Sequence, residues 1–304
     1  MRGKKSAPVA ADSSPHSSPL TPHGILYIVA TPIGNLEDIT LRAIRILREV
    51  DLVAAEDTRH TRKLLTHLGI SKPLTSYYDH NQAFKGEAIL ARLRDGASVA
   101  LVSDAGTPCI ADPGYLLVRD AAAAGIKVLP IPGPAALLAA LAAAGLPTDA
   151  FTFLGFLPSR PGKRRERLRE LQQETRTLVF YEAPHRLAAC LQDLAEILGD
   201  RPAAVARELT KLHEEFARGG LVDLAATFAQ RTVKGEVVIL VAPALRTTGT
   251  TDQAAESLEE LLRSFLDAGL SVKDAARRIA VDRGRPRGEV YAEALRIKEE
   301  KAEH

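Results

Sequence analysis

The chain has 304 residues, 46% of them apolar and 26% charged, and a formal net charge of +2. These values are typical of a globular protein of about two domains, and the net charge by itself favours no class of partner. The two cysteines, Cys109 and Cys190, are too few for a disulfide framework or a zinc cluster. We therefore expect a reduced, cytoplasmic protein without a metal site.

Two segments of the chain bear on secretion and membrane insertion. Residues 1–23 are rich in Ser, Pro and Ala, and no apolar run follows their basic start. This excludes a secretory signal and predicts a disordered tail. The one long uncharged segment, residues 128–147, contains four prolines. It would make a poor spanning helix, so no membrane segment is predicted.

From residue 25 onward, short apolar runs alternate with amphipathic segments. The runs predict strands at residues 25–30, 51–55, 73–77, 98–103 and 126–131. Helices are predicted after Thr40, which can cap the first of them, and at residues 58–68, 81–94 and 115–124. This alternation predicts an N-terminal α/β domain, residues 24–132, with a mostly parallel sheet.

The second half repeats the alternation less regularly. An Ala/Leu-rich helix after Pro134 ends at Gly145; strands are predicted at residues 151–155, 177–181, 203–207 and 236–241, and helices at 185–198 and 221–230. This indicates a second α/β domain, residues 133–245. Residues 247–251 read as a polar linker. The spacing then predicts helices at residues 257–268, 271–281 and 287–298, a small helical module of helix-turn-helix type over residues 252–300.

Three loops at strand ends of the first half are candidates for ligand binding, because parallel sheets bind ligands at the carboxyl ends of their strands. Residues 31–35 lack the dinucleotide fingerprint. Residues 55–59 combine two carboxylates with an arginine, although Asp57 or Thr58 equally suits a helix cap. Residues 103–114 are small or proline-rich, which allows close backbone approach to a cofactor but also fits two structural turns. The thiol of Cys109 in this loop is expected to pack rather than to react.

Polar groups also end strands of the second half, in residues 180–186, 207–211 and 234–236. His185 there is read as a helix-start residue. The sequence contains no P-loop, no HExxH motif and no Ser-His-Asp spacing. The residues alone therefore predict a cleft between two α/β domains without a strong catalytic signature.

Taken together, seven segments resemble one family. They are V-A-T-P-I-G-N-L-E-D (29–38), A-E-D-T-R (55–59), V-S-D-A-G-T-P-C-I-A-D-P-G (102–114), P-G-P-A-A (132–136), F-Y-E-A-P-H-R (180–186), R-E-L-T-K (207–211) and K-G-E (234–236). Their order resembles that in the ribosomal RNA small subunit methyltransferase I family, which methylates the ribose 2′-hydroxyl of cytidine 1402 in 16S ribosomal RNA. The resemblance covers about residues 26–242, and the C-terminal helices are similar to the family's appended helical domain.

The resemblance implies a tetrapyrrole-methylase fold, usually a homodimer, with S-adenosylmethionine between two α/β domains. Carried over by motif, the cofactor site comprises Pro32, Asp104, Ala105, Gly106, Cys109, Ile110, Ala135, Ala136, Tyr181 and Glu182. Ala135-Ala136 stand where many relatives have Ser-Ala, which removes one possible hydroxyl contact. Residues 1–23 have no counterpart in the family pattern.

Methylation of a ribose hydroxyl requires positioning of a weak nucleophile and acceptance of its proton. Candidate acceptors are Glu56, Asp57, Glu182 and Glu208, and Lys211 and Arg59 are candidates to orient phosphate. We expect the catalytic residues to be Asp57, Arg59, Glu182 and Lys211.

The expected partner is 16S rRNA in the small ribosomal subunit. Two candidate phosphate patches are Lys163, Arg164, Arg165, Arg167 and Arg169, and Arg277, Arg278, Arg283, Arg285 and Arg287. Charge runs of this kind are more often solvated faces of helices, and that alternative stays open for both. Two alternatives stay open: a methyltransferase acting on a tetrapyrrole or corrin precursor, and a non-catalytic RNA-binding factor with the same fold.

Overall fold

The computed structural model describes residues 24–78, 81–244, 258–283 and 286–302. Its contacts divide the chain into two units, Met1–Leu245 and Arg246–His304, which are described separately. The predicted tail, residues 1–23, and the predicted linker, residues 247–251, lie outside the described residues.

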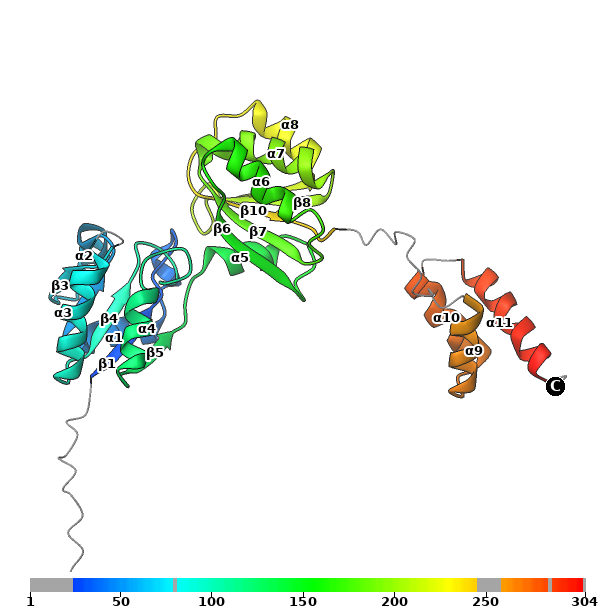
Figure 1. The fold of residues 1–304 in the computed structure, drawn as a ribbon, viewed down its shortest axis with the longest axis horizontal. Coiled ribbons are helices and arrows are strands. Elements are labelled where there is room, and N and C mark those ends of the chain that lie inside the picture. The colour runs from blue at the N-terminus through cyan, green and yellow to red at the C-terminus, as the bar shows by residue number, and fades with distance from the viewer. Residues whose placement is uncertain (1–23, 79–80, 245–257, 284–285, 303–304) are drawn as a thin grey trace, which may run out of the picture. The chain divides into compact units, whose positions relative to one another are not determined.

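The first sheet has five parallel strands in the order β3-β2-β4-β1-β5 (Figure 1). The parallel sheet predicted for this half is confirmed. Each strand end is followed by a helix or a loop, as the alternating sequence pattern requires. The strands are β1 (Ile25–Val29), β2 (Leu52–Ala55), β3 (Leu74–Ser76), β4 (Val99–Val102) and β5 (Lys127–Ile131).

Two apolar layers cover the faces of this sheet, with alternate strand residues in each. Leu52 and Ala54 of β2 pack with the helices α3 (Gln82–Arg94) and α4 (Tyr115–Ala123). Val53 and Ala55 pack on the opposite face with α1 (Leu41–Glu49) and α2 (Thr58–His67). A short 3-10 helix, η1 (Leu36–Asp38), precedes α1. β2 and β4 are buried on both faces, which is why they form continuous apolar runs in the sequence.

The second sheet also has five strands, in the order β6-β7-β10-β8-β9. Only β6 and β7 are parallel; the other three pairings are antiparallel. Its strands are β6 (Phe151–Phe156), β7 (Thr177–Glu182), β8 (Pro202–Arg207), β9 (Glu215–Gly220) and β10 (Val237–Val241). β9 was not predicted, because an edge strand of sequence E-F-A-R-G-G has neither alternation nor an apolar run.

Helices cover both faces of the second sheet. One face packs against α6 (Pro161–Glu170), α7 (Leu187–Leu198) and α8 (Leu221–Ala229), and the other against α5 (Ala136–Ala143). The 3-10 turn η2 (Pro184–Arg186) precedes α7. Ile33, from the loop after β1, joins the α5 layer and so links the core of this half to the first sheet.

The second unit contains three helices around a small core of its own. They are α9 (Leu258–Asp267), α10 (Val272–Arg283) and α11 (Arg287–Ala302), close to the three predicted ranges. The fold class predicted from the sequence, two α/β sheets with a C-terminal helical part, is therefore confirmed. Over the described residues, no helix is both long and apolar enough to cross a bilayer.

Candidate functional site

Loops after β1 and β4 meet at the carboxyl edge of the first sheet. Thr31 and Gly106 form an antiparallel bridge, with N–H to O=C distances of 2.9 and 3.0 Å. The φ of Gly106 is +81°, and a Cβ there would lie 3.4 Å from Ile33 Cγ2. Glycine suits this position because other residues are strained at such φ values and would crowd Ile33. The bridge fixes the backbone of both loops.

Asp104 ties the loop after β2 to the same edge. The Asp57 N–H donates to Asp104 Oδ1 at 3.0 Å, and the Asp104 N–H donates to Glu56 Oε2 at 3.4 Å. The Thr107 hydroxyl donates to the carbonyl of Pro134 at 3.2 Å, which adds the loop after β5. Hydrogen bonds therefore join the loops that follow β1, β2, β4 and β5 into one rim at the carboxyl edge of the first sheet.

Tyr181, near the end of β7, faces this rim from the second sheet. Its hydroxyl accepts the Leu137 N–H of the first turn of α5 at 3.1 Å. The rings of Phe153 and Phe156 contact it edge-on, with centroids 4.9 and 5.7 Å away. Burial raises the pKa of the Tyr181 phenol, so this side chain is neutral at physiological pH.

A cavity of about 530 Å³ lies between these loops and the second sheet. This volume is in the range of small-molecule and cofactor sites, and the lining is mostly apolar. Among the residues that line it, three are carboxylates and none is Lys or Arg. The site therefore suits a mainly apolar ligand with positive charge. The lining is Ile33, Ala105, Gly106, Thr107, Ile110, Ala111, Asp112, Ala135, Ala136, Leu137, Leu138, Phe156, Tyr181, Glu182, Ala183, Pro184, Leu209, Gly235, Glu236, Val237 and Val238.

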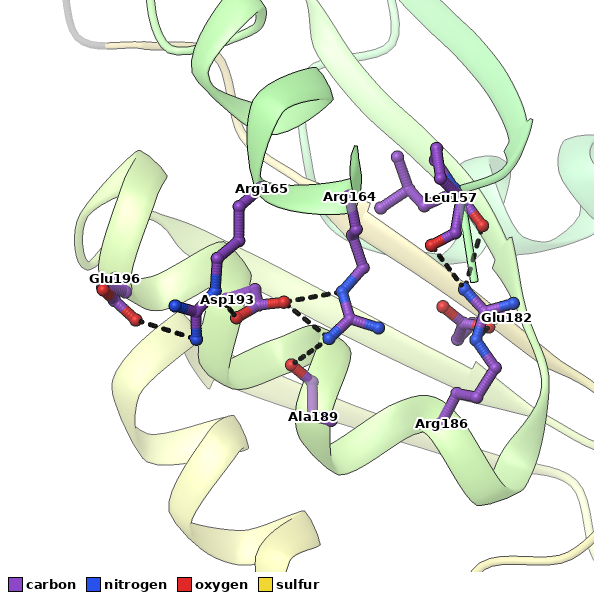
Figure 2. A network of polar contacts seen from close by, with 9 residues as sticks. Leu157, Arg164, Arg165, Glu182, Arg186, Ala189, Asp193 and Glu196 are labelled. Atoms are coloured by element: carbon purple, nitrogen blue, oxygen red, sulfur yellow. Dashed lines mark hydrogen bonds and ion pairs between the residues drawn. The ribbon is translucent and has the colours of Figure 1, made fainter. Parts of the chain in front are cut away.

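Glu182 is the most buried carboxylate of the lining, with a fully buried side chain. Figure 2 shows it beside Arg186, whose Nε lies 3.2 Å from Glu182 Oε1. The Ala183 N–H donates to the same oxygen at 2.8 Å. Within the described residues, Glu182 Oε2 has no hydrogen-bond partner. Burial, and then the charge and a hydrogen bond of Glu182, raise the pKa of the neighbouring Cys190 thiol. Because the Glu182 side chain has no exposed surface, its carboxylate acts on the cavity through its negative charge.

Arg186 holds this corner in place. Its Nη2 donates to the carbonyls of Leu157 and Pro158 at 2.9 and 3.2 Å. One guanidinium thus joins the loop after β6 to the end of β7, where Glu182 lies. These contacts limit the positions that the Glu182 carboxylate can adopt.

The predicted cofactor residues divide into two groups around this cavity. Seven of them line it: Ala105, Gly106, Ile110, Ala135, Ala136, Tyr181 and Glu182. Pro32, Asp104 and Cys109 belong to the same loops but not to the lining. Asp104 instead joins the loops through its hydrogen bonds.

Cys109 packs against the core of the first sheet rather than facing the cavity. Burial, and then the charge of Asp112, raises the pKa of its thiol to about 11. The thiolate is therefore scarce at neutral pH, which agrees with the predicted packing role. Cys190 is fully buried in α7, as the apolar sequence around it indicated.

The other predicted catalytic residues lie outside the cavity lining. The Asp57 side chain accepts the Arg59 N–H at 2.8 Å, so it does cap α2, and it also pairs with the Arg59 guanidinium at 2.9 Å. Hydrogen bonds from Arg59 lower the pKa of Asp57 to about 2. Lys211 Nζ lies 2.9 Å from Glu208 Oε1 and 3.4 Å from Glu236 Oε2. Lys211 is thus linked to the cavity through Glu236.

The first predicted phosphate patch is wrong in part, because its cations neutralise carboxylates of the protein itself. Arg164 is buried, and its Nε donates to Asp193 Oδ2 at 2.6 Å (Figure 2). Arg165 donates to the other oxygen of Asp193 at 2.7 Å, and Arg167 pairs with Glu170. The helix α6 was not among the predicted helices, although a solvated helix face was the alternative interpretation of this charged run.

The second patch is described only in part. Arg277 Nη2 lies 3.5 Å from Asp274 Oδ1, and the Arg278 guanidinium lies 5.8 Å from the ring centre of Phe265. The side chain of Arg283 and all of Arg285 lie outside the described residues. Arg287 is exposed at the start of α11.

Several cavity residues were not predicted. Gly235 and Glu236 belong to the K-G-E segment, and Asp112 to the loop 103–114, so both signals were present in the sequence. Phe156 and Leu209 carried no signal, because an apolar residue at a strand end is indistinguishable from core in a sequence. A cavity is defined by distant segments, which spacing along the chain does not reveal.

A model of the family described as Tetrapyrrole (Corrin/Porphyrin) Methylases matches residues 25–225. A protein of Xylella fastidiosa named Ribosomal RNA small subunit methyltransferase I is 52% identical over 273 residues, which cover 88% of this chain and 98% of that protein. A protein of Escherichia coli O157:H7 with the same name is 46% identical, with coverage of 92% and 98%. The chain belongs to the ribosomal RNA small subunit methyltransferase I family.

Solved structures agree with this fold. A uroporphyrin-III-C-methyltransferase from Thermus thermophilus has a TM-score of 0.52 at 24% identity and covers 73% of this chain and 95% of its own. A diphthine synthase has a TM-score of 0.55 at 17% identity, with coverage of 72% and 90%. At these identities the likeness establishes the fold alone.

Family membership confirms the predicted cofactor, S-adenosylmethionine. Two features of the cavity fit S-adenosylmethionine. Small residues, Ala105, Gly106, Ala135 and Ala136, leave backbone groups accessible around an apolar space. The carboxylates Asp112, Glu182 and Glu236 surround that space without a Lys or Arg in the lining, which suits a ligand that carries a sulfonium and an ammonium group.

Proposed function

We propose that the protein transfers a methyl group from S-adenosylmethionine to the ribose 2′-hydroxyl of a cytidine in small-subunit ribosomal RNA, cytidine 1402 of 16S rRNA. The observation that carries this proposal is the identity of 46–52% to proteins named Ribosomal RNA small subunit methyltransferase I. Those alignments span 88–94% of the chain and so include both sheets and the helical unit. The proposed setting is the cytoplasm, with the enzyme acting as a homodimer.

The cofactor supplies an electrophilic methyl group on a positively charged sulfur. Bound in the cavity, it would give its methyl carbon to O2′, the electron pair of the carbon–sulfur bond would stay on sulfur, and the hydroxyl proton would pass to a carboxylate of the site or to water. The apolar cavity lining limits the access of water. The transition state carries less positive charge than the bound cofactor, so it needs less solvation in this cavity. The carboxylate of Glu182 favours binding of the cation before transfer.

Two of the four candidate proton acceptors, Asp57 and Glu208, are weaker bases than ordinary carboxylates. Arg59 lowers the pKa of Asp57, and the hydrogen bond from Lys211 lowers the pKa of Glu208, so both carboxylates are weak bases. We therefore propose that Asp57 and Arg59 act by positioning the RNA at the substrate side. Lys211, held by Glu208 and Glu236, is proposed to orient a phosphate group.

The proposal is tested by transfer of labelled methyl from S-adenosylmethionine to small ribosomal subunits that lack the modification. Uroporphyrinogen serves as the comparison substrate, because the family model is described by tetrapyrrole methylation. Label in RNA and none in the tetrapyrrole supports the proposal. Label only in the tetrapyrrole favours a small-molecule methyltransferase, and cofactor binding without transfer to either substrate favours a non-catalytic RNA-binding factor.

The proposed roles of Asp57 and Arg59 are tested by changing each to Ala and measuring single-turnover transfer. The rate is expected to fall while affinity for S-adenosylmethionine stays unchanged, because neither side chain lines the cavity. Unchanged rates in both variants would remove the two residues from the site.

A further inference from the structure

The exposed side of α2 carries several basic side chains and no acidic one. Over its ten residues, Thr58–His67, the helix contains two arginines, one lysine and two histidines, and no acidic residue. Thr61, Leu64 and Leu65 are buried against the first sheet. The basic residues therefore occupy the face that points to solvent.

Three of these cations and one histidine lie together on one stripe of the helix. Arg59 lies three and four residues before Arg62 and Lys63, His67 lies four residues after Lys63, and with Thr66 these residues line a common surface hollow. Residues at this spacing are neighbours on a helix surface. Like charges there repel one another, so the stripe is stabilised when a polyanion binds to it.

Few of the charges in the stripe are neutralised by the protein. Over the described part of the chain, no ion pair involves Arg62 or Lys63, whereas Arg59 pairs with Asp57 while 88% of its side chain stays exposed. In α6, Arg164, Arg165 and Arg167 are paired with carboxylates, and the helix also carries Glu166 and Glu170. Of these two basic helices, α2 is the one without an acidic residue that competes with an external anion.

The position of α2 connects this surface to the cavity. The helix begins directly after Asp57, whose N–H donates to Asp104. Asp104 is followed by Ala105 and Gly106, which line the cavity. At a rise of about 1.5 Å per residue the helix is roughly 15 Å long, enough to follow more than one phosphate of an RNA strand. A strand bound along α2 is thus directed toward the cavity rim.

We propose that the basic stripe of α2, formed by Arg59, Arg62, Lys63 and His67, binds the phosphate backbone of the substrate RNA next to the nucleotide that is methylated. This inference rests on the proposed function and adds the surface on which the RNA lies. Phosphate contacts of this kind position a nucleic acid without reading its sequence.

The test removes two charges that have no other assigned role. In the double variant Arg62→Gln/Lys63→Gln, the KM for unmodified 16S rRNA is expected to rise about tenfold at moderate salt. The slope of log affinity against log salt should become shallower by about 1.4, for two single-strand phosphate contacts. The affinity for S-adenosylmethionine should not change, because neither residue lines the cavity.

The matched control is Lys163→Gln/Arg167→Gln, which removes the same charge from α6. Equal RNA affinity and salt slope in wild type and the α2 variant would overturn the inference, as would an equal loss in the control. An effect seen with assembled subunits but not with free RNA would instead assign the stripe to a ribosomal protein. If the wild type transfers no methyl group to RNA, the proposed function fails; RNA binding by the two variants, measured without turnover, still decides the inference.

Discussion

Glu182→Gln is the substitution that probes the cavity most directly. It keeps the shape of a side chain that is fully buried in the cavity lining and removes its charge. The backbone N–H of Ala183 and the guanidinium of Arg186 still have an oxygen to contact. The fold should therefore persist, while the negative potential in the cavity falls.

The size of the effect follows from the charge of Glu182. Its side chain has no exposed surface, so it acts on a bound cation through its electrostatic field rather than by direct contact. At an effective dielectric constant of about 20 and a separation of about 6–8 Å, one charge contributes roughly 2–3 kcal/mol. Its loss corresponds to a Kd for S-adenosylmethionine that is roughly 30- to 150-fold higher.

Isothermal titration calorimetry with S-adenosylmethionine and S-adenosylhomocysteine measures this change. The loss should be larger for S-adenosylmethionine, because only that ligand carries the sulfonium charge. Glu236→Gln is the matched control: it lines the same cavity, but 71% of its side chain is exposed, so solvent screens its charge. A Kd for Glu182→Gln within twofold of the wild-type value, with an unchanged melting temperature, would show that the charge of Glu182 does not favour binding of S-adenosylmethionine.

Three further predictions concern stability and titration. Asp193→Asn leaves Arg164 buried without a counter-charge and should lower the free energy of unfolding in urea by about 3–5 kcal/mol; a loss below about 1 kcal/mol would contradict the buried pair. Arg59→Gln should move the pKa of Asp57, followed by NMR, from about 2 back toward 3.8. Because that folded pKa is depressed, the stabilisation from Asp57 is fully present above pH 3.8 and is lost as the pH falls toward about 2, so it is constant between pH 5 and 9 and adds no pH dependence to stability there. Cys109, with a pKa of about 11, should react with iodoacetamide at pH 8 much more slowly than free cysteine; equal rates would contradict its burial.

The strands of the first sheet and their parallel direction could be predicted from the sequence, whereas its strand order and the pairing of the second sheet could not. Strands such as β2 and β4 are buried on both faces and follow a regular alternation with helices, which only a parallel sheet satisfies. In the second half, β10 pairs in antiparallel with both β7 and β8. Nothing in an apolar run states the direction of its neighbours, so the order of that sheet came only from the structure.

In the site, too, features that depend on neighbouring residues in the sequence could be predicted, and features that depend on distant residues could not. Small residues after β4 indicated a ligand loop, and Ala105 and Gly106 do line the cavity. The charged run in α6 was misread because the partner of Arg164 is Asp193, which lies in another helix. The basic stripe of α2 was not predicted, because Arg59 was assigned to the polar segment 55–59 and the basic residues after it were interpreted only as part of a helix.

Methyl transfer to a ribose hydroxyl is tested most directly by nucleoside analysis of the RNA product. Small subunits that lack the modification are incubated with the protein and labelled S-adenosylmethionine, and the RNA is digested and its nucleosides are identified by mass spectrometry. We predict label in 2′-O-methylcytidine, within the fragment that contains cytidine 1402. Label in a base-methylated nucleoside, or none in RNA while the cofactor still binds, would contradict it.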